Sequence, residues 1–90
     1  MSLRYEFAIS GEASRFLFGS TARIRAKAED ACEFLARRPS TEGDFQETAP
    51  SGRVHQVKIF ANLIVTYWVD HAAREIRIVN CEVVEGGLGV

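Results

Sequence analysis

The sequence has almost no surplus of either charge. Its 90 residues contain eleven lysines and arginines and twelve aspartates and glutamates, which gives a net charge of −1 at pH 7. The pI is about 6.1, whereas a domain dedicated to nucleic-acid binding usually has a pI above about 9. Any contact with nucleic acid would therefore have to rest on a local patch of cations.

Long hydrophobic runs are also missing. The apolar stretches fall well short of the roughly 18 residues that indicate a membrane span. The first residues do not show the basic region and apolar run of a signal peptide. We therefore expect a cytoplasmic protein that makes no membrane contact.

Cysteine is scarce and is not arranged for metal or redox chemistry. The two cysteines, Cys32 and Cys81, form no CxxC motif and have no histidine close by in the sequence. We expect two buried or half-buried free thiols, with a disulfide between them as the alternative. No metal and no cofactor are expected.

The sequence does contain enough apolar material for one core. Apolar residues make up 47% of the chain and charged residues 26%, as in an average soluble globular domain. Ninety residues are too few for two domains. We predict a single domain over residues 1–90, in which the glycine-rich segment 85–90, EGGLGV, is a flexible tail.

The N-terminal half has the pattern of one strand followed by two helices. Residues 3–9 alternate apolar and polar side chains, which is the period of a strand with one buried face. Ser10 is expected to cap a short first helix, and Ser20 or Thr21 to cap a longer one that spans residues 21–38. The apolar stripe of the longer helix consists of Ile24, Ala28, Ala31, Phe34 and Leu35.

The C-terminal half has the pattern of a meander. Residues 45–48 are expected to form a short edge strand, and three longer strands are expected at 53–60, 63–69 and 75–84. Short connections make neighbouring strands antiparallel. We therefore predict an α+β domain of order β-α-α-β-β-β, in which one antiparallel sheet has two helices packed on one face.

The sheet face away from the helices is predicted from the alternation of side chains along the strands. His55, Val57 and Ile59 are expected under the helices, together with alternate residues of the other strands. Contiguous apolar surface on the opposite face usually marks a protein contact; the alternative is that the tail or the segment around Phe45 folds over it. The side chains expected on that face are Val54, Gln56, Lys58, Ile64, Thr66, Trp68, Arg77, Val79, Cys81 and Val83.

Three of the candidate side chains could carry chemistry. Lys58 is the cation expected at the centre of the face, and an apolar setting can lower a lysine pKa into a range useful for acid–base work. The alternative is a solvated lysine whose stem covers its neighbours. His55 is either a general base or a structural histidine. Trp68 could stack on a nucleobase or anchor a protein interface, and the acidic pI favours the interface.

The order of elements, together with several local patterns, resembles the RelE/ParE superfamily of bacterial toxins. The patterns are a helix that ends in ARRPSTEGDF, a Gly-Arg pair before the meander, and a tyrosine near the middle of the central strand. The likeness runs from Arg4 to about Val84. It implies a toxin-like member of a type II toxin–antitoxin, or plasmid-stabilisation, system, with an antitoxin as partner and the ribosome with its mRNA, or gyrase, as target.

The resemblance also implies which nuclease residues are absent. Members that cut ribosome-bound messenger RNA, and so inhibit translation, have several lysines and arginines on this sheet face. In this sequence Lys58 and Gln56 fall on lysine positions of the family, whereas Ile64 and Val83 fall where arginines are expected. Attack by a 2′-hydroxyl on the adjacent phosphodiester needs a base, an acid and cations. One lysine does not supply all three.

Two main hypotheses follow, with a repurposed and non-toxic interaction module as a third. In the first, the protein acts through contacts with an antitoxin, a second copy of itself or a target such as gyrase. In the second it is a ribosome-dependent endoribonuclease with Lys58, Arg77 and His55 as catalytic residues. The binding residues of the first hypothesis are Arg53, Gln56, Ile64, Thr66, Trp68, Val79 and Val83.

Overall fold

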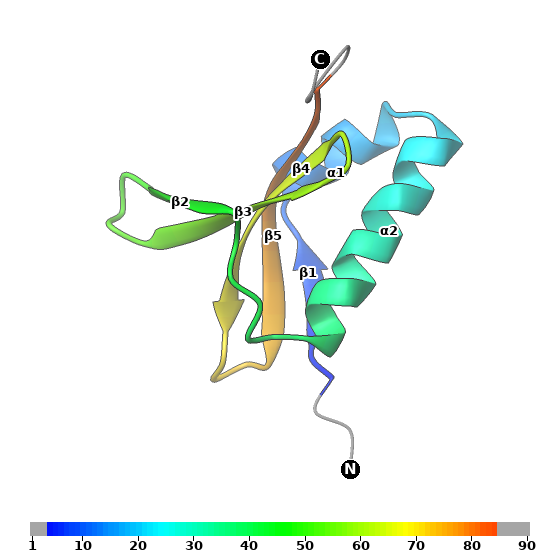
Figure 1. Cartoon of the computed structure of the whole chain (residues 1–90). Helices are drawn as coiled ribbons and strands as arrows, with labels where there is room; N and C mark the ends of the chain where they lie inside the picture. Colours follow the sequence, from blue (N-terminus) through cyan, green and yellow to red (C-terminus); the bar gives the residue numbers. More distant parts are fainter. Residues whose placement is uncertain (1–3, 85–90) are drawn as a thin grey trace.

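Two helices and five strands follow one another in the computed structural model, which describes residues 4–84 (Figure 1). The α+β class and the predicted β-α-α-β-β-β order are confirmed, with the expected edge strand at residues 45–48 as a fifth strand, and the predicted tail lies outside the described residues. No helix within this range is long and apolar enough to cross a membrane. The elements are β1 (Glu6–Ile9), α1 (Gly11–Phe18), α2 (Ala22–Arg37), β2 (Phe45–Thr48), β3 (Val54–Phe60), β4 (Leu63–Asp70) and β5 (Glu75–Val83).

The five strands form one sheet in the order β1-β5-β4-β3-β2, with both helices on the same side (Figure 1). All pairs of the meander from β2 to β5 are antiparallel, as predicted. β1 instead runs parallel to β5, so the sheet is mixed and not wholly antiparallel. Short connections determine strand direction only within the meander. β1 is connected to the meander by the two helices, and a connection of that length allows either a parallel or an antiparallel pairing.

Side-chain caps begin both helices at the expected residues. Ser10 Oγ accepts a hydrogen bond from Ala13 N at 3.0 Å, and Thr21 Oγ1 accepts one from Ile24 N at 3.2 Å. The Ser10 hydroxyl also donates to the carbonyl oxygen of Val79 at 2.7 Å. One serine thus starts α1 and ties it to β5.

The core lies between the helices and the sheet. Leu35 of α2 and Tyr67 of β4 are fully buried there, and the Tyr67 hydroxyl donates to the carbonyl oxygen of Thr41 at 2.9 Å. Cys32 and Cys81 are buried free thiols, which confirms the first of the two cysteine predictions. The core also contains Ala13, Ala28, Ala31, Leu63, Val65, Ile76 and Ile78.

The connection between β3 and β4 contains a strained residue. Ala61 has φ +58°, a left-handed conformation that costs an L-residue about 1 kcal/mol or more. We expect Ala61→Gly to raise the free energy of unfolding by about 0.5–1 kcal/mol, measured by urea denaturation. Ala72 lies in the turn before β5 and has no positive φ. The control Ala72→Gly should lower stability slightly, and a loss of the same size in Ala61→Gly would contradict the expectation.

Candidate functional site

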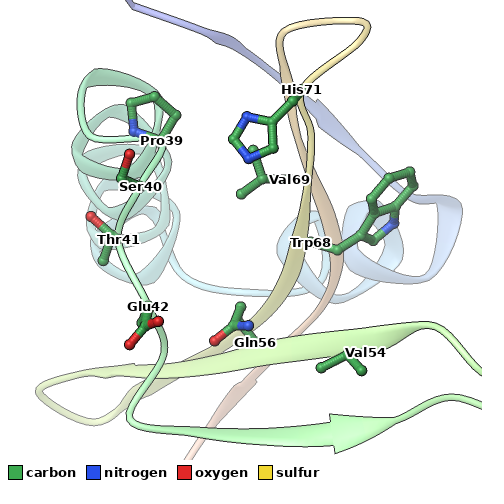
Figure 2. A pocket seen from close by; sticks show the side chains of 9 residues that line it. All are labelled: Pro39, Ser40, Thr41, Glu42, Val54, Gln56, Trp68, Val69 and His71. Atoms are coloured by element: carbon green, nitrogen blue, oxygen red, sulfur yellow. The ribbon is translucent and has the colours of Figure 1, made fainter.

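The face of the sheet that the helices do not cover is defined by β4. Leu63, Val65 and Tyr67 are fully buried in the core beneath the helices, as predicted. Alternation therefore places Ile64, Thr66 and Trp68 on the other side. Figure 2 shows Trp68 pointing away from the side of β4 on which Val69 and His71 lie. The prediction for this strand is confirmed.

The faces of β3 are the reverse of the prediction. Residues paired directly across antiparallel strands share a face. Lys58 pairs with Val65, and Gln56 pairs with Tyr67, so both point to the helix side together with Val54. The predicted positions of Lys58, Gln56 and Val54 on the uncovered face are therefore wrong. His55, Val57 and Ile59 lie on that face instead.

The pattern of β3 explains why its faces were assigned the wrong way. Its apolar residues are Val54, Val57, Ile59 and Phe60, which belong to both faces, so periodicity alone does not choose between them. Lys58 is tolerated on the helix side because it is only half-buried there and its Nζ lies 5.8 Å from the centroid of the Phe60 ring. Its stem can cover apolar surface while the ammonium reaches water.

A bulge reverses the faces of β5 halfway along the strand. Thr66 pairs with Asn80 and Tyr67 with Ile78, which leaves Val79 as an extra residue. Arg77 and Val79 lie on the uncovered face, as predicted. Beyond the bulge the parity changes, so the predicted outward positions of Cys81 and Val83 are wrong. Cys81 is 2% exposed in the core, and Val83 packs against it.

These pairings define what we call the open face. β2 lies at the edge of the sheet and pairs with β3, so the segment around Phe45 extends the open face and does not fold over it. Val57 and Thr66 are buried at its centre, 3% and 6% exposed, among side chains of neighbouring strands. The open face consists of Glu6, Ala8, Phe45, Glu47, Arg53, His55, Val57, Ile59, Ile64, Thr66, Trp68, Asp70, Glu75, Arg77, Val79, Asn80 and Glu82.

Trp68 is the main aromatic feature of the open face. The Arg53 guanidinium carbon lies 3.6 Å from the centroid of its ring, and the Arg77 guanidinium carbon lies 5.7 Å away. Both distances are within the range of cation–π attraction. The two arginines come from opposite sides of β4 in the strand order, because Arg53 precedes β3 and Arg77 belongs to β5. They hold the half-exposed indole in place.

The two arginines differ in their charge partners. Arg77 Nη2 lies 2.8 Å from Glu75 Oε1 and 3.4 Å from Asp70 Oδ2, so two carboxylates neutralise it. Its Nε is buried without a hydrogen-bond partner in the described part of the chain. Arg53 has no ion pair within residues 4–84, which leaves it the more available of the two for an anionic partner.

The three residues predicted as catalytic are not brought together. Lys58 lies on the helix side, whereas Arg77 and His55 lie on the open face, on strands that β4 separates. Across β2 and β3 His55 stands opposite Glu47 in the register, but its ring makes no hydrogen bond or ion pair within residues 4–84. Of the predicted binding residues, Arg53, Ile64, Thr66, Trp68 and Val79 do share the open face.

His71, an exposed residue in the turn before β5, makes a contact with the N-terminal segment. Its Nδ1 lies 2.9 Å from the Tyr5 hydroxyl. It also lines a hollow of about 300 Å³ between the 39–42 segment and the ends of β3 and β4 (Figure 2). Tyr5 and His71 are 66 positions apart, and no local pattern signals the pair.

The described residues offer no metal centre. Within residues 4–84 no three histidine, cysteine, aspartate or glutamate side chains gather closely enough to hold an ion. The open face instead carries an apolar centre, a tryptophan and two arginines, with carboxylates such as Asp70 and Glu75 beside Arg77. Surfaces of this composition bind protein or stack on flat rings.

The fold is that of RelE-type chains in toxin–antitoxin complexes. A chain of the RelBE2 toxin–antitoxin complex from Mycobacterium tuberculosis matches with a TM-score of 0.72 and 16% identity, over 90% of this chain and 92% of the other. A chain of the archaeal RelE-RelB complex from Pyrococcus horikoshii matches with a TM-score of 0.70 and 11% identity, over 93% and 99%. The predicted resemblance to the RelE/ParE superfamily is thereby confirmed at the level of the fold.

A third solved structure extends the same likeness. A chain of the intact E. coli RelBE toxin–antitoxin complex matches with a TM-score of 0.60 and 9% identity, over 90% of this chain and 98% of the other. No protein-family model and no curated protein matches the sequence. At these identities the likeness concerns the backbone, so the side chains of this chain have to carry any argument about function.

Proposed function

We propose that this protein is the toxin-like member of a toxin–antitoxin pair and acts in the cytoplasm through protein contacts. The three similar structures are toxin–antitoxin complexes, and the shared fold covers at least 90% of this chain in each. This likeness supports an antitoxin as one partner. A protein target in a bacterial host, of which gyrase is one example, would be the second.

The observation that carries the proposal is the composition of the open face. Its centre is apolar, its tryptophan is held by two arginines, and one of those arginines is neutralised by carboxylates. Tryptophan and arginine are the residues that most often dominate the energy of protein interfaces. Ile64 and Val79 add apolar area beside them. The open face is therefore better suited to being covered by protein than to cleaving a charged backbone.

The position of Lys58 weakens the alternative of an mRNA endoribonuclease. Stabilising the charge on the attacked phosphate requires cations on the same face as the base and the acid. With Lys58 on the helix side, the open face retains His55 and two arginines. The one observation that favours the ribonuclease is the contact of Arg53 with Trp68, since a stacked arginine and indole could also receive a nucleobase.

Expression in bacteria tests the proposal. We expect induction of the wild type to arrest growth while total mRNA stays intact, and we expect Trp68→Glu to relieve the arrest because a carboxylate would replace the anchor of the interface. The matched control is Val54→Glu, which adds the same charge on the helix side of β3 at a residue that is 47% exposed. That control should still arrest growth.

Two outcomes would contradict the proposal. Cleaved mRNA in the wild type, with cleavage lost in His55→Ala, would identify a ribonuclease. Normal growth on high-level expression of the wild type would exclude a toxin-like role. Far-UV circular dichroism and a thermal melt of each purified variant separate loss of function from loss of fold.

A further inference from the structure

A groove lies on the helix side of the sheet, away from the open face. It has a volume of about 500 Å³ and runs between α2 and the end of the β3–β4 hairpin. Its floor is apolar: the rings of Phe34 and Phe60 meet edge to face with centroids 5.8 Å apart, beside the buried Ala31. The lip is charged and consists of Lys27, Asp30 and Lys58.

The charge at the lip is only partly compensated. Lys58 Nζ has the Phe60 ring at 5.8 Å but no carboxylate partner within residues 4–84. Lys27 Nζ donates to the side-chain oxygen of Asn62 at 3.2 Å, which is a neutral acceptor. Asp30 is exposed and forms no ion pair in the described chain, so the lip bears one net positive charge. The hairpin side of the groove, where Lys58 lies, favours an anionic group.

The backbone at this end of β3 is closed to an added strand. β2 pairs with β3 only as far as Val57, so the outer edge of β3 has no strand beside it from Lys58 onward. There the Asp44 carboxylate accepts a hydrogen bond from Ile59 N at 2.7 Å. An incoming strand would need that N–H group for its own ladder. A partner must therefore enter the groove by its side chains, as an amphipathic helix does.

We propose that this groove is a second interaction surface and that it binds an acidic amphipathic helix of a partner protein. Apolar side chains one turn apart on that helix would cover Phe34 and Phe60, and its carboxylates would reach Lys58 and Lys27. Asp30 would repel a carboxylate on the α2 side, and this fixes the orientation of the helix. The groove lies on the opposite side of the sheet from Trp68, so the inference goes beyond the proposed function and stands without it.

Titration of the ¹⁵N-labelled full chain with a peptide, followed by NMR, tests the inference. The probe is a stapled amphipathic helix of about 15 residues with glutamates on its polar face. A second peptide has the same apolar residues and lysines in place of the glutamates. We expect the acidic peptide alone to shift the amide signals of Ala31, Phe34, Phe60 and Ala61. We expect Lys58→Glu to weaken its binding roughly tenfold, as the loss and reversal of one partly desolvated charge would do.

Matched variants make the test decisive. Arg23→Glu makes the same change from a positive to a negative charge, but at an exposed position of α2 outside the groove, and it should leave binding unchanged. Lys27→Glu provides a second groove variant if Lys58→Glu fails to fold. Equal binding of both peptides, shifts confined to the open face, or no shifts at all would each overturn the inference. Trp68→Glu should abolish the growth arrest but not peptide binding, which separates a failure of the groove from a failure of the proposed function.

Discussion

Replacing Gly43 with alanine is expected to lower the free energy of unfolding by about 2–3 kcal/mol, because the site has no room for a Cβ atom. A Cβ built on Gly43 would lie 2.6 Å from both the backbone nitrogen and the carbonyl oxygen of Val57, and 2.9 Å from the carbonyl oxygen of Phe45. These are backbone atoms of paired strands. They can withdraw only if the ladder between β2 and β3 is distorted.

Urea denaturation of Gly43→Ala and of a matched control measures the effect. Gly19→Ala is the control, because the nearest atoms to a Cβ there are 3.6 Å away, which is an ordinary contact. That variant should be nearly neutral. In hydrogen exchange, the amides of β2 and of Val57 should be the first to lose protection. Equal unfolding free energies for the two variants would contradict the close approach of Gly43 to β3.

Local signals made the element order predictable. Ser10 and Thr21 stand at the first turns of helices whose apolar residues recur at helical spacing, and both act as caps. The meander could be predicted because short connections allow neighbouring strands to pair only in the antiparallel direction. The parallel pairing of β1 with β5 has no such local cause, since the paired residues, such as Glu6 and Glu75, lie near opposite ends of the sequence.

The faces of the strands were harder to predict than the strands themselves. From Leu63 to Val69, β4 is apolar on both faces except at Thr66, and its faces were assigned correctly because Tyr67 was grouped in the core with Leu63 and Val65. β3 has apolar residues on both sides, and β5 changes parity at Val79. The adjacent pair Ile78 and Val79 in an otherwise alternating strand is a signal of a bulge that could have been used.

These errors determined which of the predicted site residues lie on the open face. A one-residue difference in parity moves a side chain to the opposite side of a sheet. Lys58 and Val83 therefore do not lie on the open face, whereas Trp68, on a strand whose faces were assigned correctly, does lie there. The contacts of Arg53 with Trp68 and of Gly43 with Val57 depend on how strands are placed beside one another. No window of the sequence contains that information.

Alkaline pH is expected to unfold this protein well before pH 12, because three groups that ionise are buried in the core. Burial raises the pKa of Cys32 from 9.0 to about 12, and the charges of Cys81, Glu33 and Glu29 add to the effect. Burial alone raises the pKa of Cys81 from 9.0 to about 11. Burial, with the charges of Asp44 and Glu42, raises the pKa of Tyr67 from 10.0 to about 12.

The direction of the effect follows from proton binding. Between pH 9 and the raised pKa values the unfolded chain releases protons that the folded chain keeps, so stability falls as the pH rises. The contribution of these groups to the free energy of unfolding therefore keeps its full value below pH 9 and falls progressively up to about pH 12. At about pH 10.5 each thiol should account for a loss of roughly 2 kcal/mol. Together with Tyr67, this is a large part of the roughly 5–15 kcal/mol that stabilises a typical domain.

Urea denaturation at a series of pH values, with a reductant present, measures this dependence. Cys32→Ala should be less stable than the wild type near neutral pH, by about 1 kcal/mol for the lost sulfur contacts. It should lose about 2 kcal/mol less than the wild type between pH 8 and about pH 10.5, because one of the titrating groups is gone. An identical fall in stability in both proteins would mean that Cys32 is not the buried thiol that the core places beside Cys81 and Leu35.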